Sequence, residues 1–208
     1  MTDMTPEQSV PGCGSRADVR REQILAAAEA CFRTHGFHGA SMSKLCAQAG
    51  MSPGHVYHYF ESKEAIIEGI VRRKADAILA RVEATRNAPN VLDATLERAG
   101  EGIADKLDPD FAALELEIVS EACRNPRVAR IVRDSDHEVL SNFTELVLGL
   151  RRDLGHEDSK ETLDALVDMI AILFDGITVR GIRHPEMDRE RVVALFEKTL
   201  RFLIVEWR

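Results

Sequence analysis

One short stretch of this 208-residue chain, residues 53–59, is dense in side chains that combine an aromatic ring with a hydrogen-bonding group. Such groups can bond to phosphates and to the edges of bases, and their rings can pack on thymine methyl groups. A helix of this length can turn only Val56 and the adjacent Phe60 inward. We therefore expect an outward surface that contacts a partner, formed by His55, Tyr57, His58 and Tyr59.

The residues around this stretch predict a helix, a tight turn and a second helix. Ser41 can cap a first helix over residues 41–49, where apolar residues recur at intervals of three and four. Gly50 can adopt the left-handed conformation that ends a helix. Ser52 can then cap the second helix, and Pro53 suits its first position. This order predicts a helix-turn-helix whose second helix enters the major groove of DNA.

The glycines, aromatic residues and capping serines of this region form a motif made by Gly36, Phe37, Ser41, Met42, Leu45, Ala49, Gly50, Met51, Ser52, Gly54, Val56, Tyr57, Tyr59, Phe60, Ser62, Lys63 and Glu64. Residues 16–70 thereby resemble the N-terminal DNA-binding domain of the TetR family of bacterial transcriptional regulators (TetR/AcrR-like). Cys46 stands where the family most often has Ala, and Ala40 where a hydroxyl residue is common. We expect Ala40 to lack one contact with a backbone phosphate.

The resemblance implies that the second helix and its flanks contact DNA through Ser43, Lys44, Pro53, Gly54, His55, Tyr57, His58, Tyr59 and Lys63. His55 and His58 would read bases, and Tyr57 and Tyr59 would contact phosphates or thymine methyls. At a helix start, a backbone amide could join the Lys63 ammonium in holding a phosphate. An alternative for Tyr57 alone is that it packs in the core of the small domain.

Composition favours a helical, water-soluble protein. The chain is 45% hydrophobic and 5% aromatic. No apolar run approaches the roughly 20 residues that span a bilayer, so we expect no membrane association. The N-terminus also lacks the pattern of a signal sequence. The four cysteines, at positions 13, 31, 46 and 123, show no paired spacing. A reducing, cytoplasmic location is therefore expected.

The net charge of −8 is unevenly distributed along the chain. Residues 16–63 contain six basic and four acidic side chains, a balance of +2. Residues 64–208 contain 21 basic and 29 acidic side chains, a balance of −8. The acidic excess therefore belongs to the C-terminal part, and it leaves the first part able to approach nucleic acid.

Breaks rich in Asn, Pro and Gly divide the chain into helices. We expect a disordered tail over 1–15, a helix-turn-helix DNA-binding domain over 16–62, and a linking helix with a ligand-binding and dimerisation domain over 63–208. Outside the helix-turn-helix, the expected helices cover 16–35, 63–85, 91–107, 110–124, 127–153, 159–183 and 188–206. The expected fold is all-α with about nine helices, as the resemblance also implies.

The last two expected helices are apolar on nearly all sides, so each must be covered on two sides. One side would be the core of the domain, and the other would be a second copy of the chain in a four-helix dimer interface. The interface residues would be Ile172, Gly176, Val179, Phe202 and Val205. The alternative is that these helices are enclosed within a single large monomer.

A second functional site is expected in the C-terminal part. Glu115 falls in the middle of an apolar helix face, whereas Glu117 and Glu121 project to the polar side. A carboxylate that faces a core needs a partner, either an internal Arg or Ser or a cationic ligand. The other candidate ligand-binding residues are Phe111, Ser135, Asn142, Phe143, Met169 and Phe174, although each could simply belong to the core.

The resemblance implies a homodimeric repressor that binds a palindromic operator and is released by a small-molecule inducer; activation instead of repression remains open. A zinc site at Cys31, His35 and His38 is disfavoured because His38 lies beyond the turn at Gly36. No catalytic motif is present, so no enzyme activity and no cofactor are expected. A helical metalloprotein or enzyme and a protein-binding helical adaptor are the two rival classes.

Overall fold

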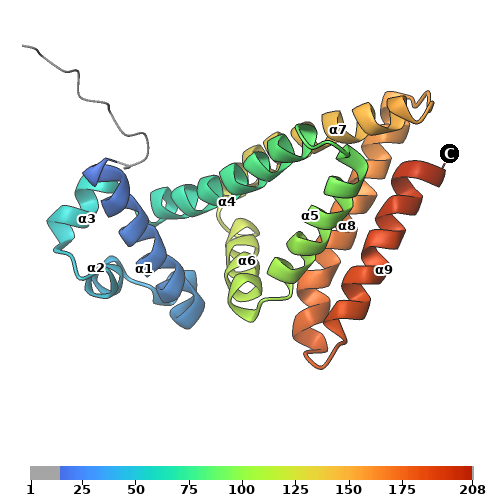
Figure 1. The fold of residues 1–208 in the computed structure, drawn as a ribbon. Coiled ribbons are helices and arrows are strands. Elements are labelled where there is room, and N and C mark those ends of the chain that lie inside the picture. The colour runs from blue at the N-terminus through green and yellow to red at the C-terminus, as the bar shows by residue number, and fades with distance from the viewer. Residues whose placement is uncertain (1–14, 208) are drawn as a thin grey trace, which may run out of the picture.

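A computed structural model describes residues 15–207, and within that range every regular element is a helix (Figure 1). The nine α-helices are α1 (Arg16–Gly39), α2 (Met42–Ala49), α3 (Pro53–Tyr59), α4 (Lys63–Arg86), α5 (Val91–Lys106), α6 (Pro109–Ala122), α7 (Pro126–Asp153), α8 (Lys160–Arg183) and α9 (Arg189–Arg201), and a π-helix, Phe202–Glu206, follows α9. The expected all-α fold with about nine helices is confirmed for the described residues. The expected disordered tail, apart from Ser15, lies outside them.

The predicted caps form as expected. The hydroxyl groups of Ser41, Ser52 and Ser62 accept hydrogen bonds from the backbone amides that begin α2, α3 and α4. Gly50 ends α2 in the left-handed conformation, with φ of 64°. Gly36, with φ of 67°, breaks α1 where the helix expected over residues 16–35 ends, and a final short turn follows it. Only glycine adopts such a conformation without strain.

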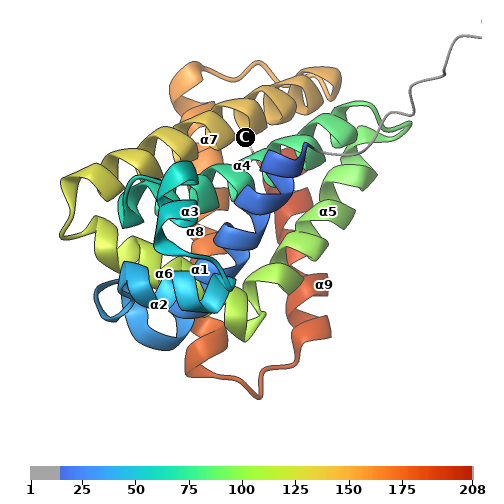
Figure 2. The same cartoon turned by 90° about the vertical axis from the view of Figure 1, so that its left-hand side faces the viewer.

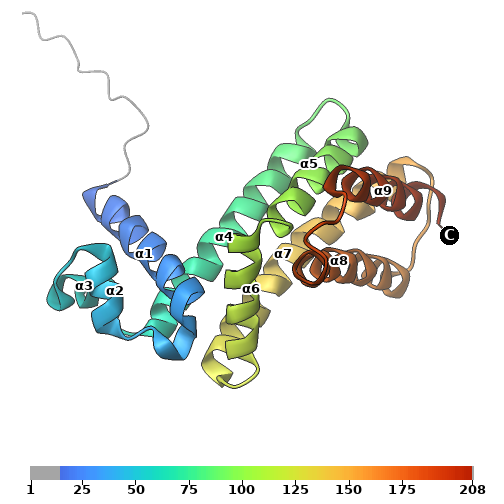
Figure 3. The ribbon, with the colours of Figure 1, turned by 90° about the horizontal axis from the view of Figure 1, so that it is seen from below.

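The helices form two hydrophobic cores at opposite ends of the molecule (Figures 1 and 3). The first core combines α1–α3 and the first half of α4 with Leu114 and Ile118 of α6 and Val128 of α7. The second joins Val82 of α4 to α5, α7, α8, α9 and the π-helix. Because α4 packs along α7 and contributes to both cores, it connects the two ends directly. Among the described helices, none is both long and apolar enough to cross a lipid bilayer.

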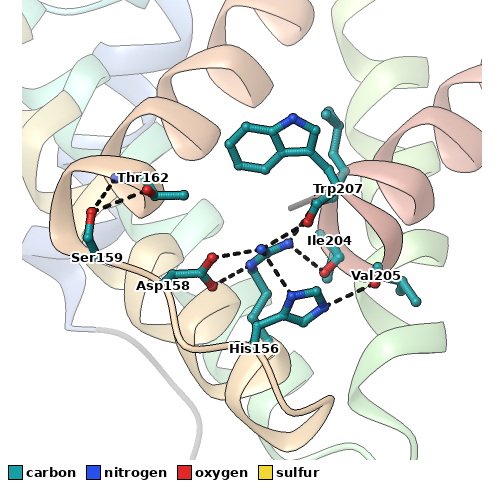
Figure 4. A network of polar contacts seen from close by, with 9 residues as sticks. His156, Asp158, Ser159, Thr162, Ile204, Val205 and Trp207 are labelled. Carbon is teal, nitrogen blue, oxygen red and sulfur yellow. Dashed lines mark hydrogen bonds and ion pairs between the residues drawn. The ribbon is translucent and has the colours of Figure 1, made fainter.

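A buried arginine holds the C-terminal π-helix in place (Figure 4). The Arg151 guanidinium donates to the carbonyl oxygens of Leu203 and Ile204, at 3.0 Å each, and of Trp207 at 3.1 Å. It also forms a two-point ion pair with Asp158, with N···O distances of 2.6 and 2.7 Å. Arg151 thus satisfies carbonyl groups at a helix end that lack donors of their own.

His156 completes this network. Its Nε2 lies 3.0 Å from the carbonyl oxygen of Val205, which can only accept, so Nε2 must carry the proton. Its Nδ1 then accepts from Arg151 at 3.3 Å. Both ring nitrogens of His156 are therefore engaged in the network. The sequence did not predict this network, because its members are up to 56 residues apart.

The Arg151–Asp158 pair predicts a pH-dependent contribution to stability. Hydrogen bonds from Arg151 lower the pKa of Asp158 below its ordinary value of 3.8. The folded-state pKa is thus below the unfolded one, so the stabilisation is complete above the unfolded pKa and is lost as the pH falls through the folded pKa. We expect Asp158→Asn to lower the unfolding free energy by roughly 2 kcal/mol at pH 7.

Urea unfolding from pH 7 down to pH 2.5 measures this effect. The difference between Asp158→Asn and the original chain should shrink toward the acidic end. A difference that stays constant with pH would contradict the assignment.

Candidate nucleic-acid interface

Helix α3 lies at the surface of the α1–α3 end, in front of α1 and above α2 in Figure 2. His55, His58 and Tyr57 are exposed, and Tyr57 retains 50% of its accessible surface. The alternative that Tyr57 fills the core is therefore wrong. Tyr59 is half-buried and packs edge-on against His58, with ring centroids 5.1 Å apart. The helix presents hydrogen-bonding rings outward, as the sequence predicts.

The opposite side of α3 is fixed in the core. Val56 and Phe60 are buried, and the Arg21 guanidinium lies 4.6 Å from the centre of the Phe60 ring. Gly69 of α4 approaches closely, since a Cβ there would lie 2.9 Å from Leu25 and 3.0 Å from Phe60. Helix α3 is therefore a rigid platform and not a mobile loop.

The flanking positions predicted to contact DNA are also accessible. Ser43, Lys44, Pro53 and Gly54 are exposed. The Lys44 ammonium donates to the carbonyl oxygen of Gly39 at 2.9 Å, which fixes the position of the side chain. The ammonium has three donors, so others can bond to a phosphate.

Lys63 has a structural contact that the sequence did not predict. It is half-buried, its ammonium donates to the carbonyl oxygen of Phe37 at 2.8 Å, and it lies 4.3 Å from the centre of the Phe37 ring. These contacts tie the start of α4 to the turn after Gly36. Any phosphate contact by Lys63 would therefore be additional to a structural role.

A second set of contacts joins that turn to α6. The carboxylate of Glu117 accepts a hydrogen bond from the backbone amide of Phe37. Glu121 is buried, and its Oε2 lies 3.6 Å from Nε2 of His38. The prediction that Glu117 and Glu121 project to the polar side is wrong. Helix α6 packs against α1 as well as α7 and α8, so it has no single polar face.

The predicted effector residues are only partly brought together. Oε1 of Glu115 forms an ion pair with Lys106 at 2.7 Å, so an internal partner exists, but it is a lysine and not Arg or Ser. Phe111 lies on the same helix beneath the Lys74 ammonium, 4.1 Å from the ring centre. Phe174 packs edge-on against Phe196 with ring centroids 4.8 Å apart.

The remaining candidates have other surroundings. Phe143 packs against the second core, Ser135 is half-buried, and the Asn142 side chain donates to the backbone carbonyl of Glu138. Met169 is 48% exposed, on the outer side of α8. Two surface concavities of the described chain have volumes of 380 and 730 Å³, and the predicted effector residues line neither.

The predicted interface residues of α8 lie on an outward face. Ile172 is 62% exposed, Val179 is exposed, and a Cβ built at Gly176 meets no atom within 4 Å. Phe202 is exposed at the end of α9, whereas Val205 is half-buried. Met169, Ile182 and Leu195 are further exposed apolar residues of these two helices.

The cysteine of the disfavoured zinc site lies in the first core. Cys31 is buried, and burial raises the pKa of its thiol. This environment disfavours the thiolate that a metal would need.

Comparison with known families agrees with this architecture. Residues 24–70 match the family model for bacterial regulatory proteins of the tetR family. Residues 92–205, more than half of the chain, match the C-terminal domain of BetI-type transcriptional repressors. The chain belongs to the TetR family.

Individual relatives of this TetR-family protein match in both sequence and structure. The HTH-type transcriptional regulator UidR of Escherichia coli (strain K12) is 34% identical over 131 residues, which are 62% of this chain and 64% of that protein. The HTH-type transcriptional regulator BetI of Vibrio vulnificus (strain YJ016) is 29% identical over 88% of this chain and 94% of that protein. The structure of Salmonella enterica GusR has a TM-score of 0.72 at 25% identity, over 89% of this chain and 95% of that one.

Substitutions at two adjacent residues of α3 should differ strongly in their effect on stability. Val56→Ala should lower the unfolding free energy by roughly 2 kcal/mol, because it opens a cavity beneath the helix. Tyr57→Ala should change it by no more than about 0.5 kcal/mol, because Tyr57 is half exposed. Urea denaturation of the two variants measures both values. A loss at Tyr57 as large as that at Val56 would show that Tyr57 supports the fold and is not a free contact surface.

Proposed function

We propose that this TetR-family protein is a transcriptional repressor that binds a palindromic DNA operator as a homodimer and is released by a small-molecule inducer. The observation that carries the proposal is the rigid helix α3, whose His55, Tyr57 and His58 are exposed above buried Val56 and Phe60. The match of residues 92–205 to a repressor domain supports repression over activation. A regulator of this kind needs no catalytic site, and we propose none.

In the proposed complex, α3 lies in the major groove. His55 and His58 read base edges, while Tyr57 and Tyr59 contact phosphates or thymine methyl groups. The helix carries Gly54 at its N-terminal end, where a side chain would otherwise separate the backbone from the duplex. Further phosphate contacts come from flanking residues, which we assign as Ser43, Lys44 and Lys63, whereas Pro53, at the start of α3, makes an apolar contact.

The proposed dimer is formed by the exposed apolar face of α8 and α9. Two copies would bury Ile172, Val179 and Phe202 against each other, with Gly176 allowing close backbone approach. Burial of such a patch is the usual way in which a soluble protein removes large apolar residues from water. We also propose a cytoplasmic location, where buried thiols such as Cys31 and Cys46 remain reduced.

The proposed route of induction runs through α4 and α6. Helix α4 contributes to both cores, and α6 connects the region of Glu115 to the turn at Phe37 through Glu117. An inducer that favours one arrangement of α6 would therefore change the position of α3. Release requires a coupling free energy on the order of 1–3 kcal/mol or more between the two sites. We also propose that residues 16–62 form the DNA-binding domain and that residues 63–208, from α4 onward, form the ligand-binding and dimerisation domain.

Selection from a library of random DNA duplexes tests the proposed operator. The protein should enrich a palindrome whose half-sites are centred one helical turn apart, roughly 34 Å, or a multiple of that distance. His55→Ala should relax the selected sequence at one position of each half-site. Enrichment of no sequence, or of a site without two-fold symmetry, would contradict the proposal.

The salt dependence of binding to the selected duplex tests the phosphate contacts. Lys44→Gln should reduce the slope of log affinity against log salt by about one per protomer. Lys160→Gln is the matched control, because Lys160 is an exposed lysine at the start of α8. Equal slopes for the original chain, Lys44→Gln and Lys160→Gln would show that Lys44 makes no phosphate contact.

Sedimentation equilibrium tests the dimer. The 23.2 kDa chain should sediment at twice its mass, and Ile172→Glu should sediment as a monomer because a charge cannot be buried in the apolar interface. Ile78→Glu, which changes an exposed isoleucine of α4, should remain dimeric. A monomeric original chain would contradict the proposed assembly.

A further inference from the structure

An unusual group of charges lies where α4, α5, α6 and α8 meet. Lys106 of α5 bridges two carboxylates, with its Nζ 2.7 Å from Glu115 of α6 and 3.1 Å from Asp175 of α8. Lys74 of α4 is near enough for the charges of Glu115 and Glu29 to raise its pKa, against a larger lowering by burial. Phe111 of α6 supplies an aromatic wall. The group therefore contains two ammonium groups and two carboxylates from four different helices.

Two atoms of this group are buried without a hydrogen-bond partner in residues 15–207: Nζ of Lys74 and Oε2 of Glu115. The Lys74 ammonium lies 4.1 Å from the centre of the Phe111 ring, whose face compensates part of the lost hydration. Burial lowers the pKa of Lys74, which reflects the cost of its charge there. A buried unpaired charge destabilises a fold, and proteins retain such groups mainly at functional sites.

The two orphaned atoms define the chemistry of a ligand. Lys74 offers donors to an anionic group, and Glu115 offers an acceptor to a hydroxyl group. Lys106 is already shared between two carboxylates, so Lys74 is the ammonium available to a new anion. The partly exposed side chains of Glu115 and Lys106, and the largely exposed Asp175, place the group within reach of solvent.

We propose that Lys74 and Glu115 form the recognition site for a hydroxycarboxylate effector, whose carboxylate accepts hydrogen bonds from Lys74 and whose hydroxyl donates to Oε2 of Glu115. This inference rests on the proposed function for its regulatory meaning, but the binding site can be tested without DNA. The ligand would also join α4 to α6, the two helices that reach the α1–α3 end.

A cationic ligand is the chief rival. Burial raises the pKa of Asp136, and the charges of Asp175 and Asp168 raise it further. A cation could therefore be attracted to this side of α7 and α8. It would leave the Lys74 ammonium without a partner, which is the reason we assign the site to an anion.

Thermal unfolding of the full-length protein distinguishes these ligands. The probes are the sodium salts of lactate and propionate, which differ only in the hydroxyl group, and choline chloride, all at equal ionic strength. Small ligands bind weakly, so each is used at up to about 20 mM. Lactate should raise the melting temperature by about 3 °C, propionate by less, and choline should cause no shift.

Variants locate the effect. Lys74→Met should raise the melting temperature by about 3 °C without ligand, because it removes a buried ammonium that has no hydrogen-bond partner, and it should abolish the response to lactate. Glu115→Gln should remove the advantage of lactate over propionate. Lys160→Gln should behave as the original chain. A lower melting temperature for Lys74→Met, a preserved lactate response, a shift with choline alone or no shift with any probe would each overturn the proposal.

A parallel measurement separates this site from the regulatory role. Lactate should weaken binding to the selected duplex at least 5-fold in the original chain and leave Lys74→Met unaffected. A protein that binds lactate through Lys74 but never binds DNA would refute the proposed function and leave the site intact. DNA binding without any lactate response would refute the site alone.

Discussion

The turn at Phe37 is the constraint on which the arrangement of the molecule depends. Its backbone amide donates to Glu117 of α6, and its carbonyl oxygen accepts from Lys63 at the start of α4. Its ring is buried in the first core and lies under the same Lys63 ammonium. One residue therefore joins the C-terminal turn of α1 to two helices of the C-terminal part, and the position of α3 follows from that attachment.

Gly36 allows this attachment. With φ of 67°, it redirects the chain so that the Phe37 amide faces α6, and a Cβ there would lie 3.1 Å from the Glu117 carboxylate. Because Leu114 and Ile118 of α6 belong to the same core as Val56 and Phe60, apolar packing reinforces the polar contact. We therefore propose that a displacement of α6 is passed on to α3, since close-packed interiors transmit strain.

Two groups of buried charges differ in whether their polar atoms have hydrogen-bond partners. Arg151 is fully buried but satisfied, because Asp158, His156 and three backbone carbonyls accept its hydrogen bonds. Such a network stabilises one conformation of the C-terminal segment. Lys74 and Glu115 instead keep buried atoms unsatisfied at the junction of four helices. We interpret the first network as structural and the second as a site that a ligand completes.

The sequence predicted most of the fold because its local signals agree with one another. Capping serines, Pro53 and Gly50 mark the helix-turn-helix within short windows. Periodicity also predicted that Ile172 and Val179 face outward, and both side chains are exposed. It was wrong for Met169, which it assigned to a pocket and whose side chain is exposed. It could not predict contacts that depend on helices distant in the chain. Glu117 and Glu121 were misplaced because α6 is covered on more than one side, and Lys74 was missed because nothing in α4 itself shows that its ammonium is enclosed.

We propose that α3 and α6 are parts of one cooperative structure joined at Phe37. Native-state hydrogen exchange measures the free energy at which each backbone amide opens. The amide of Phe37 and the core amides of α1–α3 should open together with those of α6, and Glu117→Ala should lower this shared free energy. Exchange of α1–α3 at a much lower free energy than α6, unchanged by Glu117→Ala, would contradict it.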